Sequence, residues 1–123
     1  MEIKLLDESL LPNGFHYPTA FKKIISLGLV RFDIWGIIRS DEIQSRFDGL
    51  KERYPSRQLI PFARRYDNDD IACFEIGYEG KVVIIHDFAS QGWEQREIYD
   101  TFWDWFRSVI NDMIEFEELE EYE

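Results

Sequence analysis

The clearest β-hairpin pattern of the chain lies within residues 59–86, which read LIPFARRYDNDDIACFEIGYEGKVVIIH. Residues 71–76 and 82–86 are rich in β-branched and apolar side chains, and the turn 78–81 joins them, so the pattern predicts two antiparallel strands. The apolar run 59–63 comes before them. Because Pro61 cannot donate a backbone hydrogen bond, we expect this run to form an edge strand or an extended approach to the sheet.

Downstream of the hairpin, residues 88–94 are expected to form a loop that contains a glycine and carries Trp93. Apolar side chains then recur at helical spacing from residue 97 onward, at Ile98, Phe102, Trp105, Val109 and Met113. This spacing predicts a long C-terminal helix whose broad apolar face covers the sheet.

Upstream of the hairpin, the sequence predicts two helices separated by an extended segment. Pro18 suits the first turn of a helix, and Gly28 is placed to end it in a left-handed conformation. Residues 29–38 are β-branched and aromatic, which is typical of a strand. Ser40 is then a candidate N-cap for a second helix that Pro55 closes.

The order of elements predicts a single α+β domain over residues 1–114, with a mostly antiparallel sheet, flanking helices and a long C-terminal helix. Residues 115–123 form an acidic C-terminal tail in this interpretation. The sequence shows no internal repeat and no glycine- or serine-rich linker, so nothing in it indicates a second domain.

The charge of the chain restricts its partners. Its 25 acidic residues outnumber its 14 basic ones, which gives a formal net charge of -11. Nucleic acid and anionic membranes are therefore disfavoured, and a basic or neutral protein partner is favoured. Seven acids and no base follow Asn111. This acidic end is either a solvated segment that maintains solubility or an arm that engages a basic partner.

One cysteine, Cys73, is present, so no internal disulfide can form and the chain needs no oxidising compartment. The N-terminus lacks an apolar run of signal-peptide length, and no segment approaches the about 20 apolar residues of a membrane-spanning helix. We therefore expect a cytoplasmic protein.

A cluster of polar residues, Asp67, Asn68, Asp69 and Asp70, lies between the predicted strands. The cluster lacks the glycine and the distal glutamate of a calcium loop. Side-chain bonds to nearby backbone are one expected role, and contact with Arg or Lys of a partner is the other. Trp93 is the second candidate partner-binding residue, because aromatic side chains dominate interface hot spots.

No catalytic, cofactor or metal site is expected. The sequence contains no glycine-rich phosphate loop, no nucleophile elbow and no His-Glu-x-x-His motif. Cys73, His86 and Asp87 suggest a nucleophile with a base, but Cys73 lies in an apolar strand pattern that favours a structural role. The two histidines are too few and too far apart to indicate zinc.

Several of these segments together resemble the SUKH superfamily, which includes bacterial immunity proteins and relatives of a fungal cell-wall assembly regulator. The matching pieces are Leu11-Pro12 before the helix at Phe21, the run 59–63 with the acidic turn 67–70, the strands 71–75 and 80–83, and residues 101–106 of the closing helix.

The resemblance implies a twisted sheet backed by helices and the task of binding and neutralising a toxin, frequently one directed at nucleic acid. An acidic inhibitor surface would complement a basic nuclease site. Two alternatives remain open: a general interaction or regulatory module of the same fold, and a small hydrolase whose carboxylates lie in a pocket.

Overall fold

A computed structural model describes residues 5–12 and 14–121 of the chain. Its elements, in order, are the 3-10 helix η1 (Glu8–Leu10), α1 (Thr19–Ser26), β1 (Trp35–Ile37), α2 (Ile43–Arg53), β2 (Leu59–Arg65), β3 (Asp70–Glu75), β4 (Val82–His86), β5 (Gln95–Tyr99) and α3 (Phe102–Glu121).

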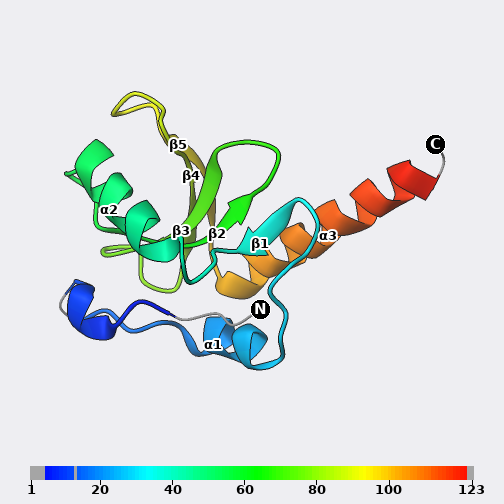
Figure 1. Ribbon diagram of the computed structural model, residues 1–123, viewed down its shortest axis with the longest axis horizontal. Coiled ribbons are helices and arrows are strands. Elements are labelled where there is room, and N and C mark those ends of the chain that lie inside the picture. The colour runs from blue at the N-terminus through cyan, green and yellow to red at the C-terminus, as the bar shows by residue number, and fades with distance from the viewer. Residues whose placement is uncertain (1–4, 13, 122–123) are drawn as a thin grey trace.

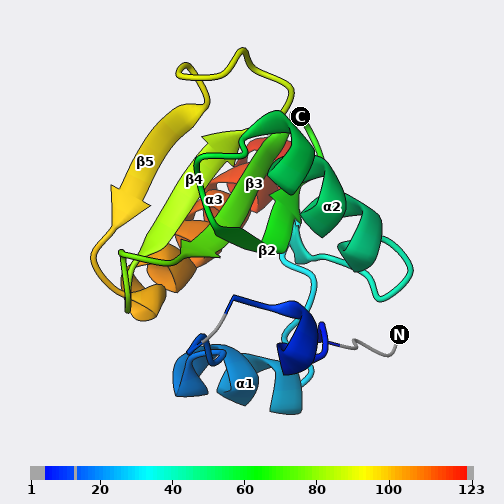
Figure 2. The ribbon, with the colours of Figure 1, turned by 90° about the vertical axis from the view of Figure 1, so that its left-hand side faces the viewer.

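The five strands form one open antiparallel sheet in the order β1-β2-β3-β4-β5, so each strand lies beside its neighbour in sequence. Helix α2 lies on one face of the sheet and α3 on the other, and α1 lies close to the start of α3 (Figures 1 and 2). The predicted α+β class, the antiparallel hairpin and the long C-terminal helix are confirmed.

An aromatic layer fills the space between the sheet and helices α1 and α3. The rings of Phe62 in β2 and Phe74 in β3 stack with centroids 4.3 Å apart. Phe21 of α1 and Phe102 of α3 meet both rings, and Trp105 packs edge-on to Phe62 at 4.9 Å. Burying several large rings in one layer supplies much of the apolar stabilisation of a domain of this size.

Helix α1 ends as its sequence predicts. Gly28 adopts a φ of 73°, and its N–H donates to the carbonyl of Ile25 while that of Leu29 donates to Ile24. These two bonds satisfy the last carbonyls of the helix, and the left-handed backbone suits glycine. By contrast, helix α2 begins at Ile43 with Glu42 as its N-cap. The prediction of Ser40 as N-cap was wrong, because residues 40–42 form a separate turn before the helix.

Two strand predictions need correction. β2 is an inner strand, whereas Pro61 predicted an edge strand or an extended approach to the sheet. The sheet tolerates the proline because β1 pairs only with Ala63–Arg65, and the register of β2 against β3 shifts between Pro61 and Ala63. Of the extended segment 29–38, only Trp35–Ile37 form a strand, since Asp33 and Ile34 turn the chain with positive φ.

The start of the C-terminal helix was also predicted wrongly. Residues 95–99 form β5, and α3 begins at Phe102. Thr101 caps α3, because its Oγ1 accepts a hydrogen bond of 3.0 Å from the N–H of Asp104. Ile98 fits the helical spacing by chance and lies half-exposed on the edge strand.

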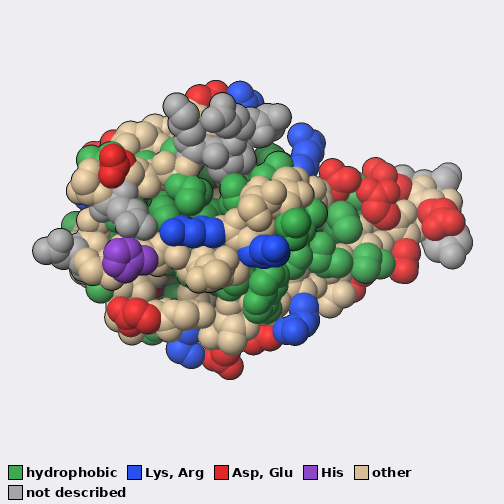
Figure 3. Space-filling model, turned by 90° about the horizontal axis from the view of Figure 1, so that it is seen from below, with side chains coloured by type: hydrophobic (Ala, Val, Ile, Leu, Met, Phe, Trp, Pro, Cys, Tyr) green, Lys and Arg blue, Asp and Glu red, His purple; other side chains and the backbone are tan. Residues whose placement is uncertain are grey.

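Helix α3 extends beyond the sheet, and acidic side chains gather over its far end (Figure 3). Residues 115–121 of the predicted acidic tail are helical. The division of the chain into a domain, residues 1–114, and a tail, residues 115–123, stays a prediction. Residues 1–4 and 13 of the predicted domain and residues 122 and 123 of the predicted tail lie outside the described residues. Within residues 5–12 and 14–121, no helix combines the length and the apolar character needed to cross a membrane.

Candidate functional site

The two segments with predicted partner-binding residues lie at the same end of the sheet. The β2–β3 turn contains Asp67, Asn68 and Asp69, and the loop 87–94 connects β4 to β5. Both lie at this end because Asp70 pairs with the last residue of β4 across the sheet (Figure 1). A bond of 2.9 Å, from the N–H of Asp87 to the carbonyl of Asp69, joins the turn to the loop.

Two of the four polar side chains of the acidic turn, those of Asp67 and Asn68, make local hydrogen bonds. Arg65 donates two hydrogen bonds to Asp67, at 2.8 and 2.9 Å, and these bonds lower the pKa of the Asp67 carboxyl. Asn68 Oδ1 accepts a bond of 2.8 Å from the N–H of Asp70. The expected turn chemistry is therefore present.

Asp70 and Asp69 differ in their exposure to partners. Asp70 Oδ1 lies 2.8 Å from His86 Nδ1, in a half-buried pair. Asp69 is exposed, and within the described chain no hydrogen bond or ion pair involves its side chain. Asp69 is therefore the carboxylate of the turn that is most accessible to an external cation.

The loop 87–94 presents two large aromatic side chains to solvent. Trp93 is 76% exposed and Phe88 61% exposed. Phe88 has a φ of 68°, a left-handed conformation that costs a residue with a Cβ about 1–2 kcal/mol. The surrounding contacts must offset this cost.

The start of the loop is anchored by a buried carboxylate. Asp87 is fully buried and accepts hydrogen bonds of 2.7 and 2.8 Å from Arg53 and one of 3.2 Å from Arg46, both on α2. The N–H of Phe88 donates to the same carboxylate at 2.9 Å. A buried carboxylate with two cationic partners holds the backbone at this point to helix α2.

The end of the loop is anchored in the same manner. Glu94 accepts bonds of 2.9 Å from Arg57 and 2.7 Å from the N–H of Gly92, while Arg57 also pairs with Glu75 at 2.7 Å. Burial alone would raise the pKa of Glu94, but the bonds from Gly92 and Arg57 outweigh it and lower that pKa. Bonding to Glu75 and Glu94 raises the pKa of the Arg57 guanidinium.

The middle of the loop is the third attachment point, where the hydroxyl of Tyr54 donates a hydrogen bond of 2.7 Å to the carbonyl of Ala89. Desolvation is the main cause of the raised pKa of Tyr54, so the hydroxyl stays a donor. Bonds at three points reduce the conformational entropy that the loop loses on binding a partner. We call residues 87–94 with these bonds the braced loop.

Sequence reasoning identified Trp93 but not Phe88 or the bracing network. One signal was available, because Arg46 and Arg53 are seven residues apart and so lie on one helix face. Asp87 directly follows an apolar strand, which also indicates a carboxylate close to the core.

Cys73, His86 and Asp87 do not form a catalytic arrangement. Cys73 is fully buried opposite Val83, and burial raises the pKa of its thiol well above the usual value. His86 faces Asp70 instead, while Asp87 binds arginine. Among the described residues, no group of three or more His, Cys, Asp or Glu side chains is placed to hold a metal ion.

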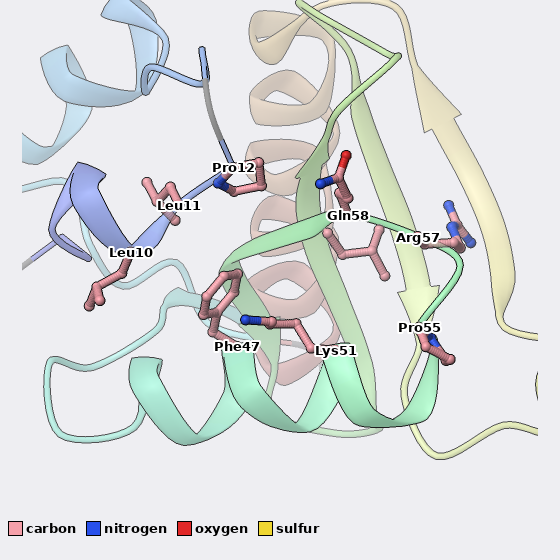
Figure 4. A pocket seen from close by; sticks show the side chains of 9 residues that line it. Leu10, Leu11, Pro12, Phe47, Lys51, Pro55, Arg57 and Gln58 are labelled. Carbon is pink, nitrogen blue, oxygen red and sulfur yellow. The ribbon is translucent and has the colours of Figure 1, made fainter.

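An apolar hollow of about 350 Å³ lies between the η1 segment, α2 and β2 (Figure 4). Leu10, Leu11 and Pro12 line one side, and Phe47 and Lys51 line the other. The ammonium of Lys51 lies 5.0 Å from the centre of the Phe47 ring. The hollow lies where the N-terminal segment meets α2, and no residue of the braced loop lines it.

These features define an α+β domain with one antiparallel sheet between helices and a braced surface loop at one sheet end. A family model described as SMI1 / KNR4 family (SUKH-1) matches residues 8–108, and the chain belongs to this family. The resemblance seen in the sequence is thereby confirmed. A search of curated proteins and a search of solved structures gave no significant match.

Proposed function

We propose that this chain is an immunity protein that binds a basic, nucleic-acid-directed toxin in the cytoplasm and blocks it by occlusion. SUKH proteins are commonly immunity proteins and are generally non-catalytic, which supports a binding role. The proposed contact surface consists of the acidic turn, Asp67 to Asp70, together with Trp93 of the braced loop.

The observation that carries this proposal is the braced loop. Its backbone is held by hydrogen bonds, and its Trp93 side chain is 76% exposed. An exposed tryptophan in a rigid loop loses little entropy when it enters a pocket on a partner. Asp69, on the adjoining turn, adds a carboxylate that attracts a basic surface. Apolar anchoring and complementary charge then act on one partner at the same sheet end.

The net charge of -11 supports the class of partner. A nuclease binds the phosphate backbone with a basic surface, and an acidic inhibitor competes for that surface at an electrostatically increased rate of association. Occlusion of the substrate requires no chemistry from the inhibitor. The proposal therefore needs no catalytic group in this chain.

The test is capture of partners from a lysate of the native cell at low and at high salt, with identification by mass spectrometry. Asp69→Lys and Trp93→Ala alter the proposed surface, and Asp69 contributes only its backbone to the bonds described above. Asp100→Lys and Trp103→Ala are matched controls. Asp100 lies near the opposite end of β5, and Trp103, on α3, is 43% exposed.

We expect the wild-type chain to retain one basic protein at low salt and to bind it more weakly at high salt. The two site variants should not retain this protein, whereas the two control variants should. Expression of that protein should arrest growth, and co-expression of the wild-type chain should restore it. A retained protein without toxicity would support the regulatory-module alternative. Equal retention by site and control variants would disprove the proposed surface.

A further inference from the structure

A hollow of about 360 Å³ lies between α2 and β2 beside the braced loop. We call it the arginine pocket, and it is lined by Glu42, Ser45, Arg46, Arg53, Arg64 and Phe88. Three guanidinium groups lining one hollow are unexpected in a chain with a net charge of -11. Their partners show how much of this positive charge is balanced.

Two of the three arginines share a single carboxylate. Arg53 binds Asp87 through two hydrogen bonds, of 2.7 and 2.8 Å, and Arg46 through one of 3.2 Å. Asp87 is fully buried and carries one negative charge, so it balances one guanidinium. The side chain of Arg46 is 18% exposed and retains N–H groups beyond the one that it directs to Asp87.

The third guanidinium is poorly neutralised. Arg64 Nη1 lies 3.8 Å from Glu42 Oε2, which is too far for a hydrogen bond, and Arg64 Nε donates to the backbone carbonyl of Arg65 at 3.2 Å. The guanidinium of Arg64 also lies over the ring of Tyr66, with its central carbon 5.4 Å from the ring centre. This contact holds the side chain in place while terminal N–H groups remain for another acceptor.

The wall of the pocket is fixed by the same contacts that brace the loop. The guanidinium of Arg53 lies over the ring of Phe88, 4.2 Å from its centre. Gly49 leaves room for this arrangement, because a Cβ at that position would lie 2.6 Å from Arg53 Nη2. The pocket therefore combines an aromatic wall with guanidinium groups that are held before any ligand arrives.

We propose that the arginine pocket binds one carboxylate side chain, Asp or Glu, of the partner protein. The source of that carboxylate rests on the proposed function, whereas the anion-binding chemistry of the pocket does not. Guanidinium groups bind carboxylates through paired N–H bonds. A carboxylate fits better than a phosphate dianion, because the three guanidinium charges less the two carboxylate charges of Asp87 and Glu42 leave one positive charge, which a monoanion balances.

The test is a titration of the isotope-labelled chain with N-acetyl-L-aspartate α-amide, followed by the NMR signals of the arginine side chains at constant ionic strength. The neutral N-acetyl-L-asparagine amide is the matched control ligand. We expect saturable shifts of the Arg64 Nε–H signal with the carboxylate alone. Arg64→Gln should weaken binding about tenfold, since it removes charge-assisted hydrogen bonds, whereas Arg107→Gln, on α3, should leave it unchanged.

Ser45→Glu provides a second variant, because Ser45 is exposed on α2 and the new carboxylate repels the ligand without altering Asp87. Urea unfolding of each variant shows that it is folded. Shifts that are linear in ligand, or equal for the neutral amide, would overturn the pocket. Tighter binding of inorganic phosphate than of the carboxylate would overturn the assignment to a carboxylate.

The titration contains no partner, so its failure is distinct from failure of the proposed function. Capture of the partner by Arg64→Gln tests the source of the carboxylate. Weaker capture than with wild type would support the assignment to the partner. Unchanged capture alongside a saturable titration would overturn that assignment while the anion site itself remains.

Discussion

At the scale of single residues, Asp87 is the side chain on which the braced loop depends most. We expect Asp87→Ala to lower the free energy of unfolding by about 3 kcal/mol, because two partly buried arginines lose their carboxylate. Urea unfolding monitored by tryptophan fluorescence measures this change. Hydrogen exchange should also become faster at residues 88–93.

Asp100→Ala is the control for this prediction. Asp100 pairs with Lys81 at 3.0 Å, but its side chain is 82% exposed, so its removal should leave stability essentially unchanged. Equal changes in the free energy of unfolding for the two substitutions would show that the buried carboxylate of Asp87 contributes no more to stability than an exposed one.

Glu94 makes stability depend on pH. Its pKa is lowered in the folded chain, although burial opposes the shift, because Gly92 and Arg57 bond to the carboxylate. A depressed pKa contributes stability that is fully present above the unfolded value of about 4.3 and is lost as the pH falls through the folded value. Glu94→Gln should therefore flatten the decline of unfolding free energy between about pH 5 and pH 3.

The control for the pH dependence is Glu52→Gln, at an exposed position of α2. Its pH profile should follow that of the wild type. A Glu94→Gln profile with the wild-type slope would mean that other carboxylates cause the acid sensitivity.

Residues of the site differ in how far the sequence could predict them. Trp93 was predictable because a tryptophan in a polar loop has no periodic apolar face to join. The place of Asp87 after an apolar strand indicates a carboxylate close to the core, but its bracing role was not predictable, because that role depends on Arg46 and Arg53, which are 41 and 34 residues away in sequence. Only the folded sheet brings these groups together.

At the scale of elements, helix α2 contains a glycine that its helical position disfavours. Gly49→Ala should normally stabilise a helix by about 1 kcal/mol. Here the new Cβ would lie 2.6 Å from Arg53 Nη2 and displace the guanidinium from Asp87. We therefore expect little or no gain in the wild-type chain.

A double-mutant cycle separates these two effects. In an Arg53→Ala background, Gly49→Ala should regain the stabilisation of about 1 kcal/mol, because no guanidinium occupies the space. Urea unfolding of the four variants gives the coupling energy. A coupling energy near zero would show that the guanidinium moves aside at no cost.

Element predictions succeeded where an apolar pattern was long or repeated and failed where pairing decided the structure. The hairpin of β3 and β4 and the body of α3 have strong periodicity. β5 has exposed side chains at Gln95, Arg96 and Glu97, so its place in the sheet comes from backbone bonds to β4 rather than from an apolar pattern. Pro61 misled the prediction because the partner strand is shorter than β2.

At the scale of the whole molecule, much of the acidic charge lies outside the packed core. Termination after Ile114 removes six acids and no base, which changes the net charge from -11 to -5. The buried residues of α3, Phe102, Trp105 and Val109, all precede this point. We expect the free energy of unfolding to change by less than about 1 kcal/mol, because few apolar contacts are lost.

Circular dichroism during urea unfolding tests the truncated chain. A loss of more than about 2 kcal/mol would show that the projecting end of α3 supports the domain. Unchanged capture of the proposed partner would also place binding at the sheet end rather than along the acidic segment.

The buried Cys73 gives this protein an internal reporter of its own opening. A thiol-specific reagent reaches a fully buried side chain only when β3 separates from its neighbours. The labelling half-time in native buffer, compared with that in denaturant, therefore yields the free energy of the opening without the introduction of another cysteine. A partner that binds only the closed sheet end should lengthen that half-time by the factor 1 + [L]/Kd, where [L] is the concentration of free partner.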